Sequence, residues 1–170
     1  MHCAGPDIGG SINSSFASSH IAGKRWAVFV HGGVFRLYNP IDGNYAMLMS
    51  KLAGLGQIGV LGVDYRTTDA QPVTEGVFPS AINDVIDAVA WLEQAGASAV
   101  TLVGDSSGGT IVIQTLLELA RRKQQRLIDL PGPTVAGAVT LSAWLDLTDS
   151  SPSYHARTHA IHTATSQRCV

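Results

Sequence analysis

Short apolar runs alternate with amphipathic stretches along the middle of this chain. The apolar runs have the length and composition of buried strands, and they lie at Trp26–Val30, Ile58–Tyr65, Ala99–Val103 and Val135–Leu141. The other stretches repeat apolar residues at helical spacing, and they cover Asn44–Leu55, Ile82–Leu92 and Thr110–Arg122. Alternating strands and helices form parallel sheets through right-handed crossovers. The pattern therefore predicts an α/β fold, a three-layer sandwich with a mainly parallel sheet.

Outside residues 25–148, which we expect to form the core, this periodicity is lost. Residues 1–24 are small and polar and residues 149–170 form a His- and Thr-rich tail, so both ends are expected to be mostly irregular. Within the core, Thr67–Gly76 is expected to be a polar loop, and Pro79 suits a first helical turn. The helix Thr110–Arg122 is apolar almost all round, which predicts that it is covered on most sides.

The composition narrows the class of protein. The chain has 170 residues, enough for one domain with a sizeable core, and its net charge of −2 gives no basic surface for nucleic acid. Apolar runs are too short to span a membrane, and residues 1–20 do not resemble a signal peptide. Cys3 and Cys169 suggest no disulfide framework. We therefore expect a cytoplasmic protein that has no nucleic-acid partner and no membrane span.

A glycine-flanked corner joins the strand Ala99–Val103 to the helix after it. Its sequence, Gly104-Asp105-Ser106-Ser107-Gly108, matches G-x-S-x-G, the spacing of a nucleophile elbow. A serine at the apex of such a turn takes a strained backbone that lifts its hydroxyl clear of the sheet, and the two flanking positions leave no room for a Cβ. The alternative is a chance glycine–serine turn, which the position between a clear strand and a clear helix disfavours.

A second glycine-rich segment, His31-Gly32-Gly33-Val34-Phe35, ends the first strand. Parallel sheets carry their chemistry at the carboxyl ends of the strands, so this segment and Ser106 are expected to share one pocket. The amides that begin the helix after Ser106 are placed to bind a developing oxyanion. A Rossmann-like nucleotide site is disfavoured because no G-x-G-x-x-G follows the first strand.

Five stretches, in the same order along the chain, resemble the hormone-sensitive-lipase-like esterases of the α/β-hydrolase superfamily. The segment His31–Phe35 resembles that family's HGGG loop, and Gly104–Gly109 resembles its GDSAGG turn. The other likenesses are Val63-Asp64-Tyr65-Arg66 with its DYR strand end, Phe78-Pro79 and Asp84 with the helix start that follows, and Leu141–Thr148 with its SPWLDLT strand. The resemblance implies a carboxylesterase-type hydrolase that acts on a small-molecule ester without a cofactor.

The resemblance also implies roles for single residues. Ser106 would be the acylating nucleophile, and the oxyanion hole would consist of backbone N–H groups of Gly33, Val34 and Ser107. His31 and Gly32 would support that loop rather than transfer protons. Val34 stands where the family has a third glycine, which keeps a backbone donor but narrows the acyl pocket with a branched side chain. Structural roles are expected for the charged residues Asp64, Arg66 and Asp105.

The motifs supply neither the acid nor the histidine of a catalytic triad. In α/β-hydrolases these follow the nucleophile, and the family places them on strands beyond the Leu141–Thr148 segment. The candidate residues after Ser106 are Asp146, Asp149, His155, His159 and His162. The histidines equally suit solvated loop positions or, with His2 and His20, an accidental weak metal-binding cluster, so no metal site is assigned. We therefore expect an incomplete α/β-hydrolase fold, shortened at both ends.

Two functions of different class follow from this. The first is a serine carboxylic-ester hydrolase that works through an acyl-enzyme on Ser106. The second is a catalytically inactive remnant or an interaction module, because a serine without a base is a poor nucleophile. Without the further strands of a full fold, Val135–Leu141 would be a bare apolar edge, which predicts self-association through that edge. The helices Ile82–Leu92 and Ile111–Leu119 would likewise lack part of their cover.

Overall fold

The computed structural model describes residues 23–70, 72–125 and 135–152 of the chain. In chain order the elements are β1 (Arg25–Val30), α2 (Gly43–Gly56), β2 (Gly59–Val63), the 3-10 helix η1 (Val73–Gly76), α3 (Ser80–Gln94), β3 (Ala99–Asp105), α4 (Ser107–Gln124) and β4 (Val135–Leu141). All the predicted strands and helices are present. The short helix η1 is an addition, because it lies in the segment that we expected to be a loop.

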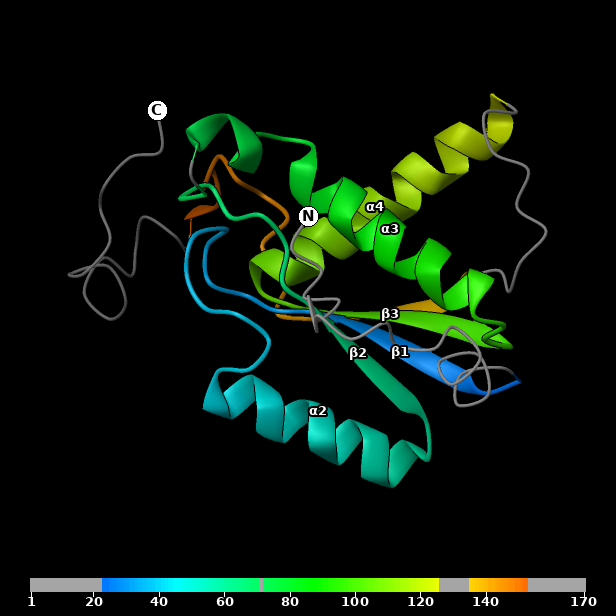
Figure 1. Ribbon diagram of the computed structural model, residues 1–170. Helices are drawn as coiled ribbons and strands as arrows, with labels where there is room; N and C mark the ends of the chain where they lie inside the picture. Colours follow the sequence, from blue (N-terminus) through cyan, green and yellow to red (C-terminus); the bar gives the residue numbers. More distant parts are fainter. Residues whose placement is uncertain (1–22, 71, 126–134, 153–170) are drawn as a thin grey trace.

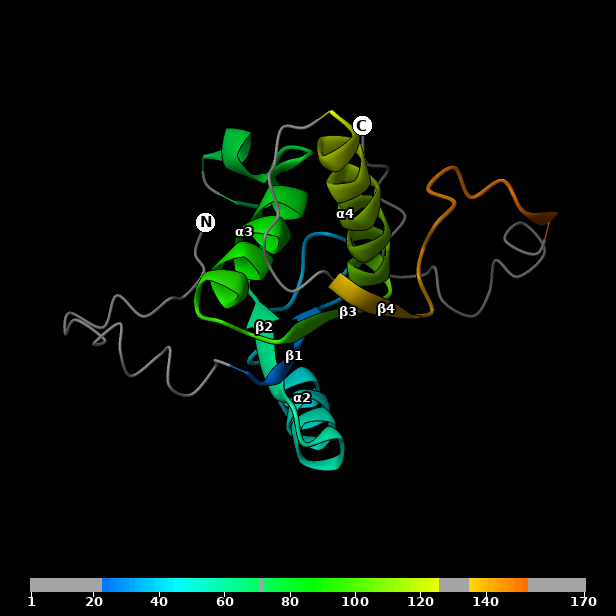
Figure 2. The ribbon, with the colours of Figure 1, turned by 90° about the vertical axis from the view of Figure 1, so that its right-hand side faces the viewer.

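The strands form one parallel sheet in the order β2-β1-β3-β4. Figure 1 shows α2 on one face of this sheet and both α3 and α4 on the other, and the turned view in Figure 2 shows the same three layers. This arrangement confirms the predicted α/β sandwich with a parallel sheet.

Alternate residues of β1 supply the two halves of the core. Val28 and Val30 belong to the larger buried cluster, which α3 and α4 complete. Ala27 and Phe29 belong to a smaller cluster, against which partly buried residues of α2 pack. Successive side chains of a strand point to opposite faces, so this central strand is apolar at every position from Trp26 to Val30.

One expectation about burial is wrong. The second strand was expected to be buried, but β2 lies at one edge of the sheet, and four of its five residues are only half-buried. The helix α4 was expected to be covered except for part of Ile111–Leu119, and within that range the Leu117 side chain is 66% exposed. The first turns of α4 are buried against the sheet, whereas Leu117 lies further along the helix and lines an open groove.

The opposite edge of the sheet is β4, as expected. Val139 and Leu141 on this strand are 49% and 42% exposed, so the edge is open and partly apolar among the described residues. Self-association through it stays a prediction.

Arg66 joins the end of β2 to α3. Its guanidinium makes an ion pair with Asp84 at 2.7 Å, and its backbone N–H donates to the same carboxylate at 2.9 Å. Asp84 is 1% exposed, so the pair fixes the loop after β2 from inside the molecule. The structural role expected for Arg66 is thereby confirmed.

The helices among the described residues lack the combination of length and apolar composition that crossing a membrane would need. The expected irregular ends fall mainly on residues 1–22 and 153–170, which lie outside the described residues, as do Cys3 and Cys169. The predicted domain boundaries therefore stay predictions.

Candidate active site

Ser106 lies at the turn between β3 and α4. Its φ of 52° and ψ of −120° are a conformation that costs a non-glycine residue about 1–3 kcal/mol. The residue is half-buried, and its side chain makes no capping hydrogen bond to the helix. The backbone is held firmly: Ser106 N donates to Leu141 O at 2.8 Å, and Ser106 O accepts from Trp144 N at 3.3 Å. The side chain is therefore presented at the tip of the turn and not along a helix.

The two glycines that flank this turn have no space for a side chain. A Cβ on Gly104 would lie 2.4 Å from Gly108 O, and a Cβ on Gly108 would lie 2.2 Å from Val30 O and 2.4 Å from His31 O. All three distances are well below van der Waals contact. The requirement for glycine predicted at these two positions is confirmed, and Gly108 shows that the turn touches the end of β1.

The segment after β1 folds into a tight loop beside the Ser106 turn. Gly33, Val34 and Phe35 all have positive φ, at 113°, 51° and 64°. Phe35 N donates to Ser107 Oγ at 3.2 Å, which ties this loop to the first residue of α4. The two glycine-rich segments therefore meet at the carboxyl edge of the sheet, as we expected.

His31 is fully buried beneath this loop. Its ring stacks on Tyr65, with centroids 4.2 Å apart, and its Nδ1 lies 2.7 Å from Gly32 O. Only a protonated Nδ1 can donate to a carbonyl, and burial lowers the pKa of His31. The ring is thus neutral and buried. These contacts suit a residue that supports the loop and not one that takes a proton from Ser106.

Two tyrosines that sequence reasoning did not single out hold the His31–Gly32 peptide. Tyr65 donates its hydroxyl to His31 O at 3.0 Å, and Tyr45 accepts a hydrogen bond from Gly32 N at 3.1 Å. Burial is the main reason that the pKa of Tyr45 rises to about 12 and that of Tyr65 rises even further. Tyr45 was visible in the sequence only as an apolar position of a helix, and Tyr65 only as the middle residue of the DYR motif.

The carboxylate of Asp105, the residue before Ser106, is engaged by Tyr45. The Tyr45 hydroxyl donates to Asp105 Oδ2 at 2.8 Å. This contact agrees with the structural role expected for Asp105.

The segment after β4 packs against the Ser106 turn. Trp144 O accepts a hydrogen bond from Thr110 Oγ1, and the Trp144 ring lies 6.2 Å from that of Phe35, between ring centroids. With the bond from Trp144 N to Ser106 O, these contacts place an aromatic pair from two segments beside the turn.

The predicted acids lie in the same segment, but each carboxylate is already engaged. Asp146 accepts hydrogen bonds from the backbone and side chains of Thr148 and Ser150, which lower its pKa. Asp149 accepts from Trp144 Nε1 at 3.1 Å. The predicted bases His155 and His159, and also His162, lie outside the described residues. In the described ranges His31 is the single histidine.

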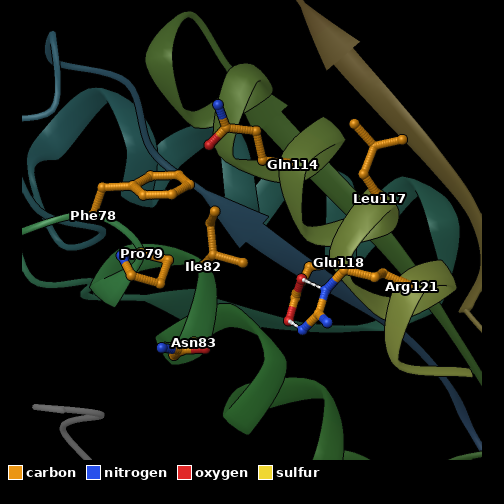
Figure 3. A pocket seen from close by; sticks show the side chains of 8 residues that line it. All are labelled: Phe78, Pro79, Ile82, Asn83, Gln114, Leu117, Glu118 and Arg121. Atoms are coloured by element: carbon orange, nitrogen blue, oxygen red, sulfur yellow. Dashed lines mark hydrogen bonds and ion pairs between the residues drawn. The ribbon is translucent and has the colours of Figure 1, made fainter. Parts of the chain in front are cut away.

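A groove of about 450 Å³ lies elsewhere, between the beginning of α3 and the middle of α4. Figure 3 shows Phe78 and Leu117 at its sides and the ion pair of Glu118 with Arg121 along one wall. Neither Ser106 nor any residue predicted for the oxyanion hole lines this groove. It is therefore a separate surface feature.

Comparison with known proteins gives consistent matches. The model of the family described as alpha/beta hydrolase fold matches residues 27–169. An acetyl-hydrolase from Streptomyces hygroscopicus is 31% identical over 135 residues, which cover 78% of this chain and 40% of that protein. A kynurenine formamidase-like hydrolase from Fusarium equiseti is 29% identical over 119 residues, which cover 59% of this chain and 40% of that protein.

Solved structures give the same picture. A hormone-sensitive lipase from a metagenome library superposes with a TM-score of 0.58 and 29% identity, over 76% of this chain and 40% of the lipase chain. This chain therefore spans 40% of the length of each of these relatives.

Proposed function

Because this chain belongs to the alpha/beta hydrolase fold family, we propose that it hydrolyses carboxylic esters through an acyl-enzyme on Ser106. The family match and the likeness to a hormone-sensitive lipase confirm the resemblance predicted from these motifs. The observation that carries the proposal is the meeting of the strained Ser106 turn with the loop after His31 at one edge of the sheet.

Ser106 is the proposed nucleophile. Its Oγ would bond to the ester carbonyl carbon, and the carbonyl π electrons would move onto the oxygen. As the tetrahedral intermediate collapses, the bond to the alkoxy group breaks and the alcohol leaves with the proton that Ser106 gave up. Water then attacks the acyl-serine in the same manner, which releases the carboxylic acid and restores Ser106. His155 and His159 are the predicted carriers of the proton, with Asp146 or Asp149 as the predicted acid.

Three backbone N–H groups are proposed to stabilise the oxyanion, those of Gly33, Val34 and Ser107. Ser107 begins α4, and the first N–H groups of a helix have no partner within it and lie at the positive end of the dipole. Gly32 O accepts from His31 Nδ1, and in a trans peptide the next N–H points the opposite way. The Gly33 N–H therefore points away from the His31 ring.

Val34 supports a preference for short acyl groups. It carries a branched side chain, 38% exposed, in the loop that supplies two of the proposed donors. An acetyl ester would fit beside such a side chain better than a long acyl chain would. One relative is named as an acetyl-hydrolase and another as formamidase-like, so acetyl esters and formamides are the substrates to compare.

Active-site labelling of the purified chain with a fluorophosphonate tests the nucleophile. We expect the wild-type protein to be labelled and Ser106→Ala to be unlabelled. Ser50→Ala is the matched control, because Ser50 is exposed on α2 and its hydroxyl donates only to Ala46 O; it should be labelled like the wild type. Labelling that persists in Ser106→Ala would refute the assignment.

Hydrolysis of p-nitrophenyl acetate, butyrate and octanoate tests the reaction itself. We expect the acetate to give the highest kcat/KM and Ser106→Ala to lose about 10⁴–10⁶ in turnover. A folded wild-type chain that is neither labelled nor active would instead support the catalytically inactive alternative.

A further inference from the structure

We propose that Tyr45 is a positioning residue whose hydroxyl couples the oxyanion loop after β1 to the nucleophile turn after β3. The inference rests on the proposed function, because the position of the loop amides matters to the reaction only if Ser106 is acylated. Nothing in the motifs assigns this role to Tyr45, which comes from α2 on the other side of the sheet from α3 and α4 (Figure 1).

The Tyr45 hydroxyl makes one contact with each of the two segments. It accepts a hydrogen bond from Gly32 N at 3.1 Å and donates one to Asp105 Oδ2 at 2.8 Å. Gly32 precedes the first proposed oxyanion donor by one residue, and Asp105 precedes the nucleophile by one residue. A single oxygen atom therefore links the immediate neighbours of both functional groups.

Gly32 is closely packed against both Tyr45 and Asp105. A Cβ at Gly32 would lie 2.9 Å from Tyr45 Oη, 2.9 Å from Asp105 Oδ2 and 3.0 Å from Asp105 O. The peptide between His31 and Gly32 is held at both ends, at its carbonyl by Tyr65 and at its N–H by Tyr45. Without the Tyr45 hydroxyl, the N–H end would lose its partner and the loop could rotate about the bond that Tyr65 retains.

The Tyr45 ring is itself fixed. Its centroid lies 5.6 Å from that of Phe29 and 6.0 Å from that of His31. A phenol must be protonated to donate to Asp105 while it accepts from Gly32, and burial raises the pKa of Tyr45 to about 12. The link is therefore intact throughout the pH range in which an esterase is assayed.

Tyr45→Phe removes the hydroxyl and keeps the ring, so it tests the link directly. Because a displacement of about 1 Å in a reacting group costs about 100-fold, we expect labelling by the fluorophosphonate and kcat for p-nitrophenyl acetate to fall about 10- to 100-fold. KM should stay within about threefold, since the contact positions charge-stabilising groups and does not bind the substrate. Tyr38→Phe is the matched control, because Tyr38 is 60% exposed and packs edge-on against Tyr45; its rates should stay within about twofold of the wild type.

Asp105→Asn provides a second variant that keeps the shape of the side chain. Loss of the charge weakens the hydrogen bond from Tyr45, so we expect about a three- to tenfold loss in kcat. The double variant should lose little more than Tyr45→Phe alone, since both changes break the same link. Additive losses would overturn the proposal.

Amide hydrogen exchange at Gly32, followed by NMR, gives a readout that needs no activity. The Gly32 N–H should exchange about 3- to 10-fold faster in Tyr45→Phe than in the wild type or Tyr38→Phe, because it loses its hydrogen bond. A labelled wild type with equal labelling rates in Tyr45→Phe and Tyr38→Phe overturns the proposal. If the wild type is not labelled, the proposed function fails, and the exchange rate of the Gly32 amide then tests the link by itself. Faster exchange in Tyr45→Phe supports the link, and unchanged exchange overturns it.

Discussion

Replacing Gly108 by alanine tests the close approach on which the candidate site depends. Gly108 lies within the first turn of α4, where helix propensity alone favours alanine over glycine by up to about 1 kcal/mol. The added Cβ would, however, lie 2.2 Å from Val30 O and 2.4 Å from His31 O. Both oxygens belong to the backbone at the buried end of β1, so the conflict cannot be relieved by a rotamer change and α4 must move away from β1.

The magnitude follows from the sum of these opposing effects. Overpacking against an unyielding neighbour costs about 1–3 kcal/mol, which outweighs the gain in propensity and leaves a net loss of about 1–2 kcal/mol in the free energy of unfolding. For a domain of this size that corresponds to a fall of about 2–8 °C in Tm. The same movement separates Ser106 from the loop after His31, so labelling by the fluorophosphonate should slow about 100-fold.

Thermal unfolding followed by circular dichroism measures the first effect, with Gly54→Ala as the matched control. Gly54 lies in α2, and a Cβ there would meet nothing within 4 Å, so this variant should gain about 0.5–1 kcal/mol from propensity. The two glycine-to-alanine changes are therefore expected to have opposite signs. A Gly108→Ala protein as stable as Gly54→Ala, and labelled at the wild-type rate, would refute the reasoning.

Two further predictions concern stability. Asp84→Asn removes the charge from the carboxylate that holds Arg66, and because the Asp84 side chain is 1% exposed and that of Arg66 is 27% exposed, urea unfolding should show a loss of about 2–3 kcal/mol in the free energy of unfolding. The control Asp69→Asn, which alters the exposed ion pair with Arg36, should cost less than about 0.5 kcal/mol. Equal losses in the two variants would contradict the importance of burial. Burial lowers the pKa of His31, so the unfolded chain binds this proton more tightly and the fold should lose stability as the pH falls through the ordinary histidine range and regain it as the pH rises. Urea midpoints at about pH 7.5 and about pH 5.5 check this; the difference between them should shrink in His31→Gln, and an unchanged difference would exclude His31 as its source.

The order of elements and the meeting of the two glycine-rich segments could be predicted because local patterns determine both. Apolar runs as short as Trp26–Val30 indicate strands, and the G-x-S-x-G spacing requires a turn whatever surrounds it. The strand β4 was predicted with the bounds that the structure has, Val135–Leu141. The resemblance to a known family then assigned roles that periodicity could not.

Contacts that single side chains make between distant segments could not be predicted in this way. Tyr45 occupies an apolar position in the helical repeat of α2, and nothing in its neighbourhood indicates that its hydroxyl reaches Gly32 and Asp105, 13 and 60 residues away. The burial of β2 was overestimated because an apolar run looks the same at an edge and at the centre of a sheet. Which neighbour a strand acquires is decided by the packing of the whole sheet.

The helix α2 is the least anchored of the three main helices. None of its residues is buried, whereas α3 and α4 each bury seven, and local opening is cheapest where the fewest apolar contacts must be broken. Tyr45 is carried by this helix. When α2 separates from the sheet, the Tyr45 side chain moves with it. The loop beside Ser106 then loses its hydrogen bond to Tyr45, while the strands and the helices α3 and α4 stay folded. Loss of function on warming would thus precede loss of the fold, and the weakest layer of the molecule would set the upper temperature of the reaction.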